Sequence, residues 1–106
     1  MLTTVQGQLW QIISGSRYCQ IVDGGRCVTD GVGNYGDNED CEVEALQTLI
    51  MTTEQYSIEI DYDFITVKGY QYKWRGPNTV RMQAGDKWTW ESDSDIQRAG
   101  FKICGR

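Results

Sequence analysis

The chain contains no histidine among its 106 residues, and this absence removes several kinds of chemistry. Histidine is the commonest general base in enzymes and the commonest protein ligand of transition metals. Catalytic arrangements that need a histidine beside a serine or cysteine nucleophile are therefore excluded within this chain. Paired carboxylates would allow glycoside hydrolysis, but nothing marks out an acid pair at a suitable separation. We expect a protein that is not an enzyme.

Long hydrophobic runs and an excess of basic residues are also missing. No stretch of about 18 apolar residues is present, so we expect no membrane-spanning segment. Ten basic and fifteen acidic residues give a net charge of −5, which argues against nucleic acids and anionic membrane surfaces as partners. The opening residues, MLTTVQGQLW, lack the basic start and apolar run of a signal peptide. We therefore expect a mature fragment, or one module cut from a longer protein.

Proline is represented only by Pro77, and no apolar stripe of helical spacing is long enough to anchor a bundle. Val, Ile, Thr, Tyr and Trp recur in short alternating runs between turns. The pattern predicts an all-β domain with roughly eight to ten strands, arranged as a two-sheet antiparallel sandwich or jelly roll. We expect strands at 9–13, 18–22, 27–29, 41–46, 56–60, 64–67, 70–74, 79–83, 87–91 and 100–104. After Leu46 the pattern also allows a helical turn.

The side chains expected in the core come from these alternating runs. They are Trp10, Ile58, Ile65, Val67, Trp88, Trp90 and Phe101. The four tryptophans could instead form a platform on which sugars stack, but Trp88 and Trp90 match apolar core positions of the sandwich, which favours the core.

The segment from Tyr56 to Gly69 changes phase in its middle. Even-numbered positions are apolar up to Tyr62, whereas odd-numbered positions are apolar from Ile65 onward. One straight strand cannot satisfy both patterns, so we predict a bend near Asp61–Asp63. The bend gathers three acids between two strands, namely Glu59, Asp61 and Asp63. Carboxylate oxygens on a loop are ligands that Ca²⁺ prefers, so a calcium site is predicted at this bend.

Four cysteines stand at positions 19, 27, 41 and 104, with spacings of eight, fourteen and sixty-three residues. These spacings lack the paired CxxC motifs of a zinc site, and the even number favours two disulfides formed in an oxidising compartment. Of three connectivities, we favour Cys19–Cys27 with Cys41–Cys104. The Asp23-Gly24-Gly25 turn lies midway between the first pair and would bring their sulfurs together.

Two further stretches are candidates for binding. The segment Asp30–Asp40 is rich in glycine, asparagine and acids, and it is either a solvated turn or a loop that carries ligands. The stretch Tyr70–Trp74 (YQYKW) forms an aromatic stripe suited to an exposed contact surface. We therefore assign partner-binding roles to four aromatic residues: Tyr35, Tyr70, Tyr72 and Trp74.

Several motifs in the right order resemble those of the CUB domain family. The matching stretches are Asn34-Tyr35-Gly36, Cys41, Ser57-Ile58-Glu59, Tyr62–Val67, Gly76-Pro77, Trp88–Asp93 and Gly100-Phe101. The resemblance runs from Cys27 to the end of the chain. It departs from the family at Asp61 and near Trp74, where the family carries a pair of cysteines. It implies one CUB-like β-sandwich over residues 1–106, with an N-terminal strand and disulfide hairpin in 1–26 and a CUB-like core in 27–106.

Calcium-binding CUB domains use three acids whose matching positions in this chain are Glu59, Asp63 and Asp93. Asp95 lies nearby in sequence and could assist. The resemblance implies an extracellular or cell-surface module that grips a basic side chain of a protein partner, with calcium as a candidate cofactor.

Two other functions remain open. The chain could be a repeating subunit of an extracellular fibre or coat, binding copies of itself by adding the uncharged segment MLTTVQGQLW as a strand to a neighbour. It could also be a glycan-binding module that uses its aromatic faces.

Overall fold

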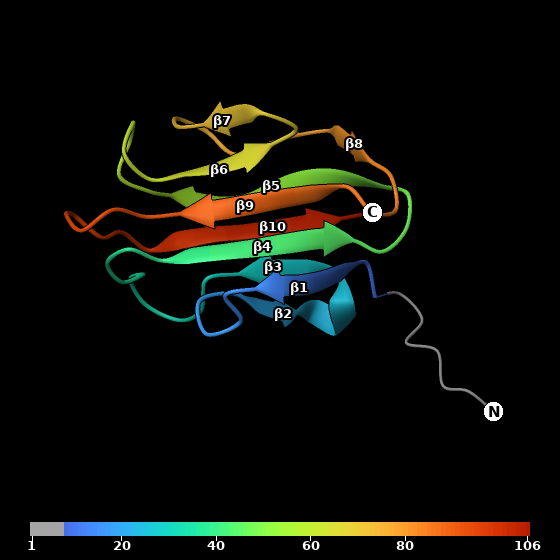
Figure 1. Cartoon of the computed structure of the whole chain (residues 1–106), viewed down its shortest axis with the longest axis horizontal. Coiled ribbons are helices and arrows are strands. Elements are labelled where there is room, and N and C mark those ends of the chain that lie inside the picture. Colours follow the sequence, from blue (N-terminus) through green and yellow to red (C-terminus); the bar gives the residue numbers. More distant parts are fainter. Residues whose placement is uncertain (1–7) are drawn as a thin grey trace.

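The structure, a computed structural model, describes residues 8–106, and its strands run along the long axis of the molecule (Figure 1). Ten strands in this part of the chain form two five-stranded antiparallel sheets. The first sheet has the order β1 (Trp10–Ser14), β4 (Asp40–Ala45), β9 (Lys87–Glu91), β6 (Phe64–Val67) and β7 (Tyr70–Tyr72). The second has the order β2 (Gln20–Val22), β3 (Cys27–Thr29), β10 (Gly100–Gly105), β5 (Leu49–Ser57) and β8 (Val80–Met82). The predicted two-sheet sandwich is confirmed.

Several strands lie where the alternation of the sequence predicts them. The predicted strands 64–67 and 87–91 are found with the same bounds as β6 and β9. The ambiguous stretch after Leu46 is a short bend, after which β5 begins at Leu49, so no helical turn forms there. The strand predicted at 56–60 is wrong in its bounds, because β5 ends at Ser57.

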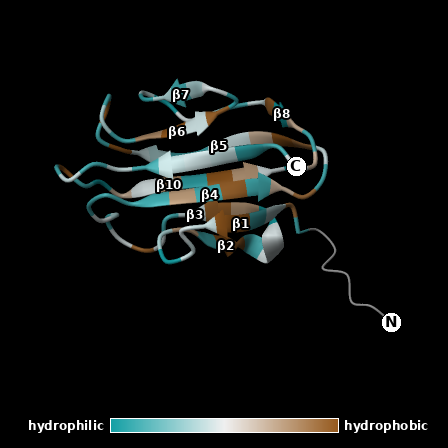
Figure 2. Ribbon diagram, viewed as in Figure 1, coloured by the Kyte–Doolittle hydropathy of each residue, from teal (hydrophilic) through white to brown (hydrophobic). Residues whose placement is uncertain are grey.

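The core lies between the central strands of the two sheets, β9 and β10. Trp88 and Trp90 on β9 both pack against Phe101 on β10, with ring centroids 5.8 and 5.0 Å apart. Trp10 packs edge-on against Trp88 at 5.9 Å. All the predicted core residues are buried. Figure 2 shows hydrophobic residues along β1, β3 and β4, with many hydrophilic residues in the loops.

All four cysteines form disulfides, as predicted, but the favoured pairing is wrong. The bonds join Cys19 to Cys41 and Cys27 to Cys104. The hairpin of β2 and β3 exists, yet its turn places Val22 opposite Cys27, so Cys19 lies beyond the paired residues. Cys27 instead lies directly opposite Cys104 on the neighbouring strand β10. Two disulfides are consistent with an oxidising, extracellular setting.

The N-terminal part of the chain adds one strand to each sheet. β1 pairs with β4 at an edge of the first sheet, and β2 pairs with β3 at an edge of the second. The segment proposed to pair with a neighbouring subunit falls mostly on residues 1–7, which lie outside the described residues. No helix in residues 8–106 is both long and apolar enough to cross a membrane.

Candidate metal centre

Three loops meet at one end of the sandwich, at the left of Figure 1. They connect β3 to β4 (residues 30–39), β5 to β6 (residues 58–63) and β9 to β10 (residues 92–99). Hydrogen bonds join the first of these loops to the third, because Tyr35 N donates to Arg98 O at 3.1 Å and Asn38 N donates to Asp93 O at 2.9 Å. We call these three loops the acid end.

A tight turn in the β5–β6 loop decides which side chains face inward. The amides of Tyr62 and Asp63 both donate to Glu59 O, at 3.1 and 3.0 Å, and Asp61 takes a positive φ of 76°. The predicted bend is therefore confirmed. Its consequence was not foreseen: Glu59 and Asp63 are buried, whereas Ile60 and Tyr62 are exposed. The alternation places Ile60 and Tyr62 on the same inward face as Ile58, and this expectation is wrong for Ile60 and Tyr62, whereas Ile58 is buried.

Three carboxyl groups converge inside this turn. One oxygen from each of Glu59, Asp63 and Asp93 lies within 4.8 Å of the other two. Asp93 N donates to Asp63 Oδ1 at 2.9 Å, which fixes the β9–β10 loop against the turn. Asp61 is exposed and is not part of this group. The structure thus brings together the three acids that the CUB resemblance selects, and not the three gathered from the β5–β6 segment alone.

Tyr35 forms hydrogen bonds with two members of this cluster. Its hydroxyl donates to Asp63 Oδ2 at 2.5 Å and accepts a hydrogen bond from Glu59 N at 3.0 Å. The ring is only 3% exposed and packs edge-on against Trp90 at 5.0 Å. Burial, with the hydrogen bond to Asp63, raises the pKa of Tyr35. The assignment of Tyr35 to a partner-binding surface therefore does not fit its position inside the domain.

The Glu59 carboxyl group is the least satisfied of the three. Its side chain is 8% exposed, and its Oε1 atom is buried without a hydrogen-bond partner. Burial raises the pKa of Glu59, and the neighbouring charges of Asp93 and Asp63 raise it further. Burial likewise raises the pKa of Asp63, although hydrogen bonds from Tyr35 and from Asp93 N oppose the shift. A buried acceptor without a donor calls for a ligand or a proton.

Glu39 is a structural member of the acid end that sequence reasoning missed. Its Oε2 accepts from Gly36 N at 2.7 Å and its Oε1 from Trp90 Nε1 at 3.1 Å. Its amide donates to Ser92 Oγ at 2.9 Å, and that hydroxyl donates to Gly36 O at 2.9 Å. This network holds the residue before Asp93 in place. No sequence signal separates Glu39 from the other acids of its loop.

The donor atoms of the cluster fit a hard divalent cation. Ca²⁺ takes about six to eight oxygen ligands, and carboxylates, carbonyls and water commonly share this role. Both carboxylate oxygens of Asp63 accept hydrogen bonds, so they are held in place before any ion binds. Asp95 is exposed, and its amide donates to Asp93 Oδ1 at 3.0 Å, which orients that carboxylate.

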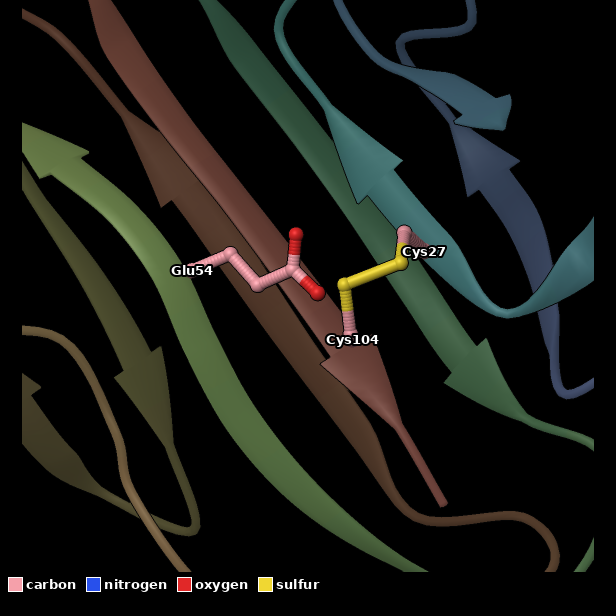
Figure 3. Close-up of side chains that lie close together, drawn as sticks. All are labelled: Cys27, Glu54 and Cys104. Carbon is pink, nitrogen blue, oxygen red and sulfur yellow. A yellow bond between two sulfur atoms is a disulfide. The ribbon is translucent and has the colours of Figure 1, made fainter. Parts of the chain in front are cut away.

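A second group of ligand-type atoms consists of Cys27, Glu54 and Cys104, which Figure 3 shows side by side. The two sulfurs are joined in a disulfide, so neither is available as a thiolate ligand. Glu54 forms an ion pair with Lys102 at 3.4 Å. This group is therefore a covalent link with a neighbouring ion pair, and it is not a metal site.

The remaining predicted binding residues lie on the edge strand β7 and in the segment after it, which the hydrogen bond from Asp61 N to Lys73 O joins to the β5–β6 loop. Tyr70 and Trp74 are 64% and 69% exposed, and Tyr72 is half-buried. With their neighbours they line a depression of about 590 Å³. We call this feature the aromatic depression; its principal lining residues are Tyr70, Tyr72, Lys73, Trp74, Arg75 and Asn78.

Comparisons with known proteins add no family assignment. No protein-family model, curated protein or solved structure matches the chain. The function of the domain must therefore be inferred from its residues and their geometry.

Proposed function

We propose that this chain is a non-catalytic, CUB-like binding module of an extracellular or cell-surface protein, and that Glu59, Asp63 and Asp93 bind calcium. The observation that carries the proposal is the buried, unpartnered Oε1 atom of Glu59 inside a group of three carboxylates. The function of the module is to bind a protein partner, with the acid end as the contact surface.

Burial of these three charges close together is unfavourable in the absence of a cation. A buried carboxylate without a hydrogen-bond donor is destabilising, and two further carboxylates within 4.8 Å add repulsion. A divalent cation supplies positive charge and accepts oxygen lone pairs from all three groups at once. Asp63 is already held by Tyr35 and by Asp93 N, which supports a site that is assembled in advance.

The surroundings of the cluster support a contact surface for a partner. Four large apolar side chains are exposed on the three loops of the acid end, namely Val32, Ile60, Tyr62 and Ile96. Exposed apolar groups on loops beside a charged site are typical of interaction surfaces. A lysine or arginine of the partner would meet carboxylate oxygens at the centre and apolar contacts around them.

Calorimetric titration with calcium tests the proposal, together with melting curves in calcium and in chelator. We expect weak to moderate affinity, with Kd of about 10⁻⁴–10⁻³ M as in extracellular modules. At ten times Kd, binding to the folded state alone should stabilise it by about 1.4 kcal/mol. Glu59→Gln and Asp93→Asn should each remove the heat of binding and the stabilisation.

Glu91→Gln is the matched control, because Glu91 is an exposed glutamate on β9 outside the cluster. It changes the net charge by the same amount and should leave calcium binding intact. Absence of binding heat in the native protein at millimolar calcium, with equal melting temperatures in calcium and chelator, would refute the calcium site. The buried Oε1 of Glu59 would then be satisfied by a proton shared with Asp93.

The fibre-subunit alternative depends on a segment outside the described residues and stays a prediction. Deletion of residues 1–8 remains its test, because loss of assembly with a folded monomer would support it.

A further inference from the structure

The aromatic depression combines exposed aromatic rings with positive charge. Tyr70 and Tyr72 lie edge to face with centroids 4.6 Å apart, and Trp74 is 69% exposed. Lys73 and Arg75 alternate with these aromatic residues along the chain and also line the depression. The volume of about 590 Å³ falls within the range of small-molecule sites, about 300–1,000 Å³.

The charge of this surface runs against that of the whole protein. The chain carries a net charge of −5, yet no acidic residue lines the depression. Within residues 8–106, neither Lys73 nor Arg75 forms an ion pair. The ammonium group of Lys73 lies 5.5 Å from the centre of the Phe64 ring, and Arg75 is exposed. Two cations are therefore available to an anionic ligand.

The backbone beneath the depression is fixed, although residues 73–79 are irregular. Tyr56 Oη donates to Tyr72 O at 2.5 Å, and Asp61 N donates to Lys73 O at 3.1 Å. Thr53 Oγ1 donates to Pro77 O at 2.6 Å. These three hydrogen bonds hold successive parts of the segment against the domain. A surface held in this way loses little conformational entropy when a ligand binds.

Gly76 shows how closely this segment is packed. A Cβ atom at Gly76 would lie 2.3 Å from Thr53 Oγ1 and 2.7 Å from Thr53 Cγ2, so only glycine fits. The next residue, Pro77, is buried, and its carbonyl accepts the hydrogen bond from Thr53 on β5. Trp74 and Arg75, which immediately precede Gly76, are both exposed.

We propose that the aromatic depression binds an anionic saccharide, whose sugar rings stack on Trp74 and Tyr70 while a carboxylate or sulfate group pairs with Lys73 and Arg75. Sugar rings present apolar faces to aromatic rings, and guanidinium binds carboxylate and sulfate through paired hydrogen bonds. The amide of Asn78 adds hydrogen-bonding capacity for hydroxyl groups.

A bound acidic peptide is the weaker alternative on the same surface. A peptide that adds a strand depends on backbone hydrogen bonds along an edge, and β7 is only three residues long. The depression offers compact aromatic faces instead of a long free edge. This proposal shares no residue with the calcium site and stands or falls independently of it.

Fluorescence titration of the full chain provides a local readout of binding. Trp74 is exposed, whereas Trp10, Trp88 and Trp90 are at most 1% exposed, so a ligand on the depression perturbs chiefly one indole. The probes are a galacturonate trisaccharide, a sulfated galactose trisaccharide and the neutral galactose trisaccharide. At least one charged trisaccharide should bind about tenfold more tightly than the neutral one, since one charge-assisted contact corresponds to at least that factor.

Paired charge variants test where the anion binds. The double variant Lys73→Gln with Arg75→Gln should weaken binding of the charged trisaccharide at least about tenfold. The control, Lys87→Gln with Arg106→Gln, removes the same charge from two exposed residues elsewhere and should change affinity less than about twofold. Trp74→Ala, followed by calorimetry, should also abolish measurable binding.

Three results would overturn the proposal. The first is no binding of either charged trisaccharide at millimolar concentration. The second is an equal loss of affinity in both double variants, which would show attraction by overall charge only. The third is a hexaglutamate peptide that binds the depression more tightly than the saccharides, which would assign the surface to an acidic protein segment. All four substituted cations and Trp74 are at least partly exposed, so the variants should fold.

Discussion

The acid end and the aromatic depression carry the two kinds of candidate binding chemistry in this domain, and they are built in opposite ways. The acid end hides its functional groups: Glu59 and Asp63 are buried, and four large apolar side chains are exposed on the loops around them. The depression exposes its functional groups, with Trp74 and Arg75 open to solvent over a fixed backbone. Without a ligand, the buried Oε1 atom of Glu59 in the acid end has no hydrogen-bond partner. The polar groups of the depression are exposed and can form hydrogen bonds with water instead.

This difference determines what mutation should do to each region. Groups of the acid end are part of the packed interior, so changing them should alter both stability and binding. Groups of the depression contribute little to the core, so changing them should alter binding alone. Substituting the same residue type once in each region can separate these two effects.

Truncating Trp90 or Trp74 should give the largest difference in stability between the two regions. Trp90 is fully buried, packs on Tyr35 and Phe101, and donates to Glu39 Oε1. Trp90→Ala should lower the free energy of unfolding by about 3–5 kcal/mol. Trp74→Ala should lower it by less than about 0.5 kcal/mol, because that side chain is exposed. Chemical denaturation measures both values, and a loss below about 1 kcal/mol for Trp90 would contradict its place in the core.

Replacing Tyr35 or Tyr70 by phenylalanine tests how much each hydroxyl group contributes to stability. Tyr35→Phe removes the hydroxyl that joins Asp63 Oδ2 to Glu59 N and leaves buried groups unsatisfied. We expect a loss of about 1–3 kcal/mol in the free energy of unfolding, measured by chemical denaturation. Tyr70→Phe, on the exposed side of β7, should be nearly neutral. Equal effects of the two substitutions would show that the hydroxyl of Tyr35 does not support the cluster.

Asp30 and Asp86 provide the smallest expected change in stability. Their contributions to stability should depend on pH with opposite signs. Asp30 Oδ1 accepts from Phe101 N at 2.8 Å, while Asp30 Oδ2 is buried without a partner. Burial raises the pKa of Asp30 to about 6. The folded state then holds a proton more tightly than the unfolded state, so this group's stabilising contribution is complete below pH 3.8 and is lost as pH rises through about 6. Asp30→Asn should therefore gain stability relative to the native protein over that window.

Asp86, in the turn before β9 at the other end of the molecule, is the counterpart. Hydrogen bonding to the amide of Gln83, together with Lys68, lowers the pKa of Asp86. Its stabilising contribution is present above the unfolded pKa and is lost as pH falls through the lowered value. Asp86→Asn should thus be destabilised at neutral pH and approach the native protein in acid. Thermal melts between about pH 3 and 7 compare the variants, and like signs would contradict the assignment.

Local alternation was sufficient to predict much of the sandwich. Lys87–Glu91 places two tryptophans on one face of a strand, and the structure buries both. Cysteine pairing was not predictable in the same way, because it depends on strand register. A hairpin turn at residues 23–26 sets Val22 opposite Cys27, and only the neighbouring strand β10 supplies a partner for that cysteine.

The candidate metal centre shows the same limit. A break in alternation correctly located the bend near Asp61, but not the direction in which the side chains point. That direction depends on the turn in which two amides bond to Glu59 O, and on the hydroxyl of Tyr35, which arrives from a loop 24 residues away in sequence. Long-range contacts of this kind leave no periodic signal. The resemblance to CUB domains supplied Asp93, which spacing alone would not have selected.

The two disulfides have a consequence for the integrity of the chain. Their cysteines interleave along the sequence, because 27 lies between 19 and 41, and 41 lies between 27 and 104. Any single cut of the backbone between residues 19 and 104 therefore leaves two pieces that remain covalently joined. The exposed loops of the acid end fall entirely inside this range. A protease that nicks one of them releases no fragment unless the disulfides are also reduced.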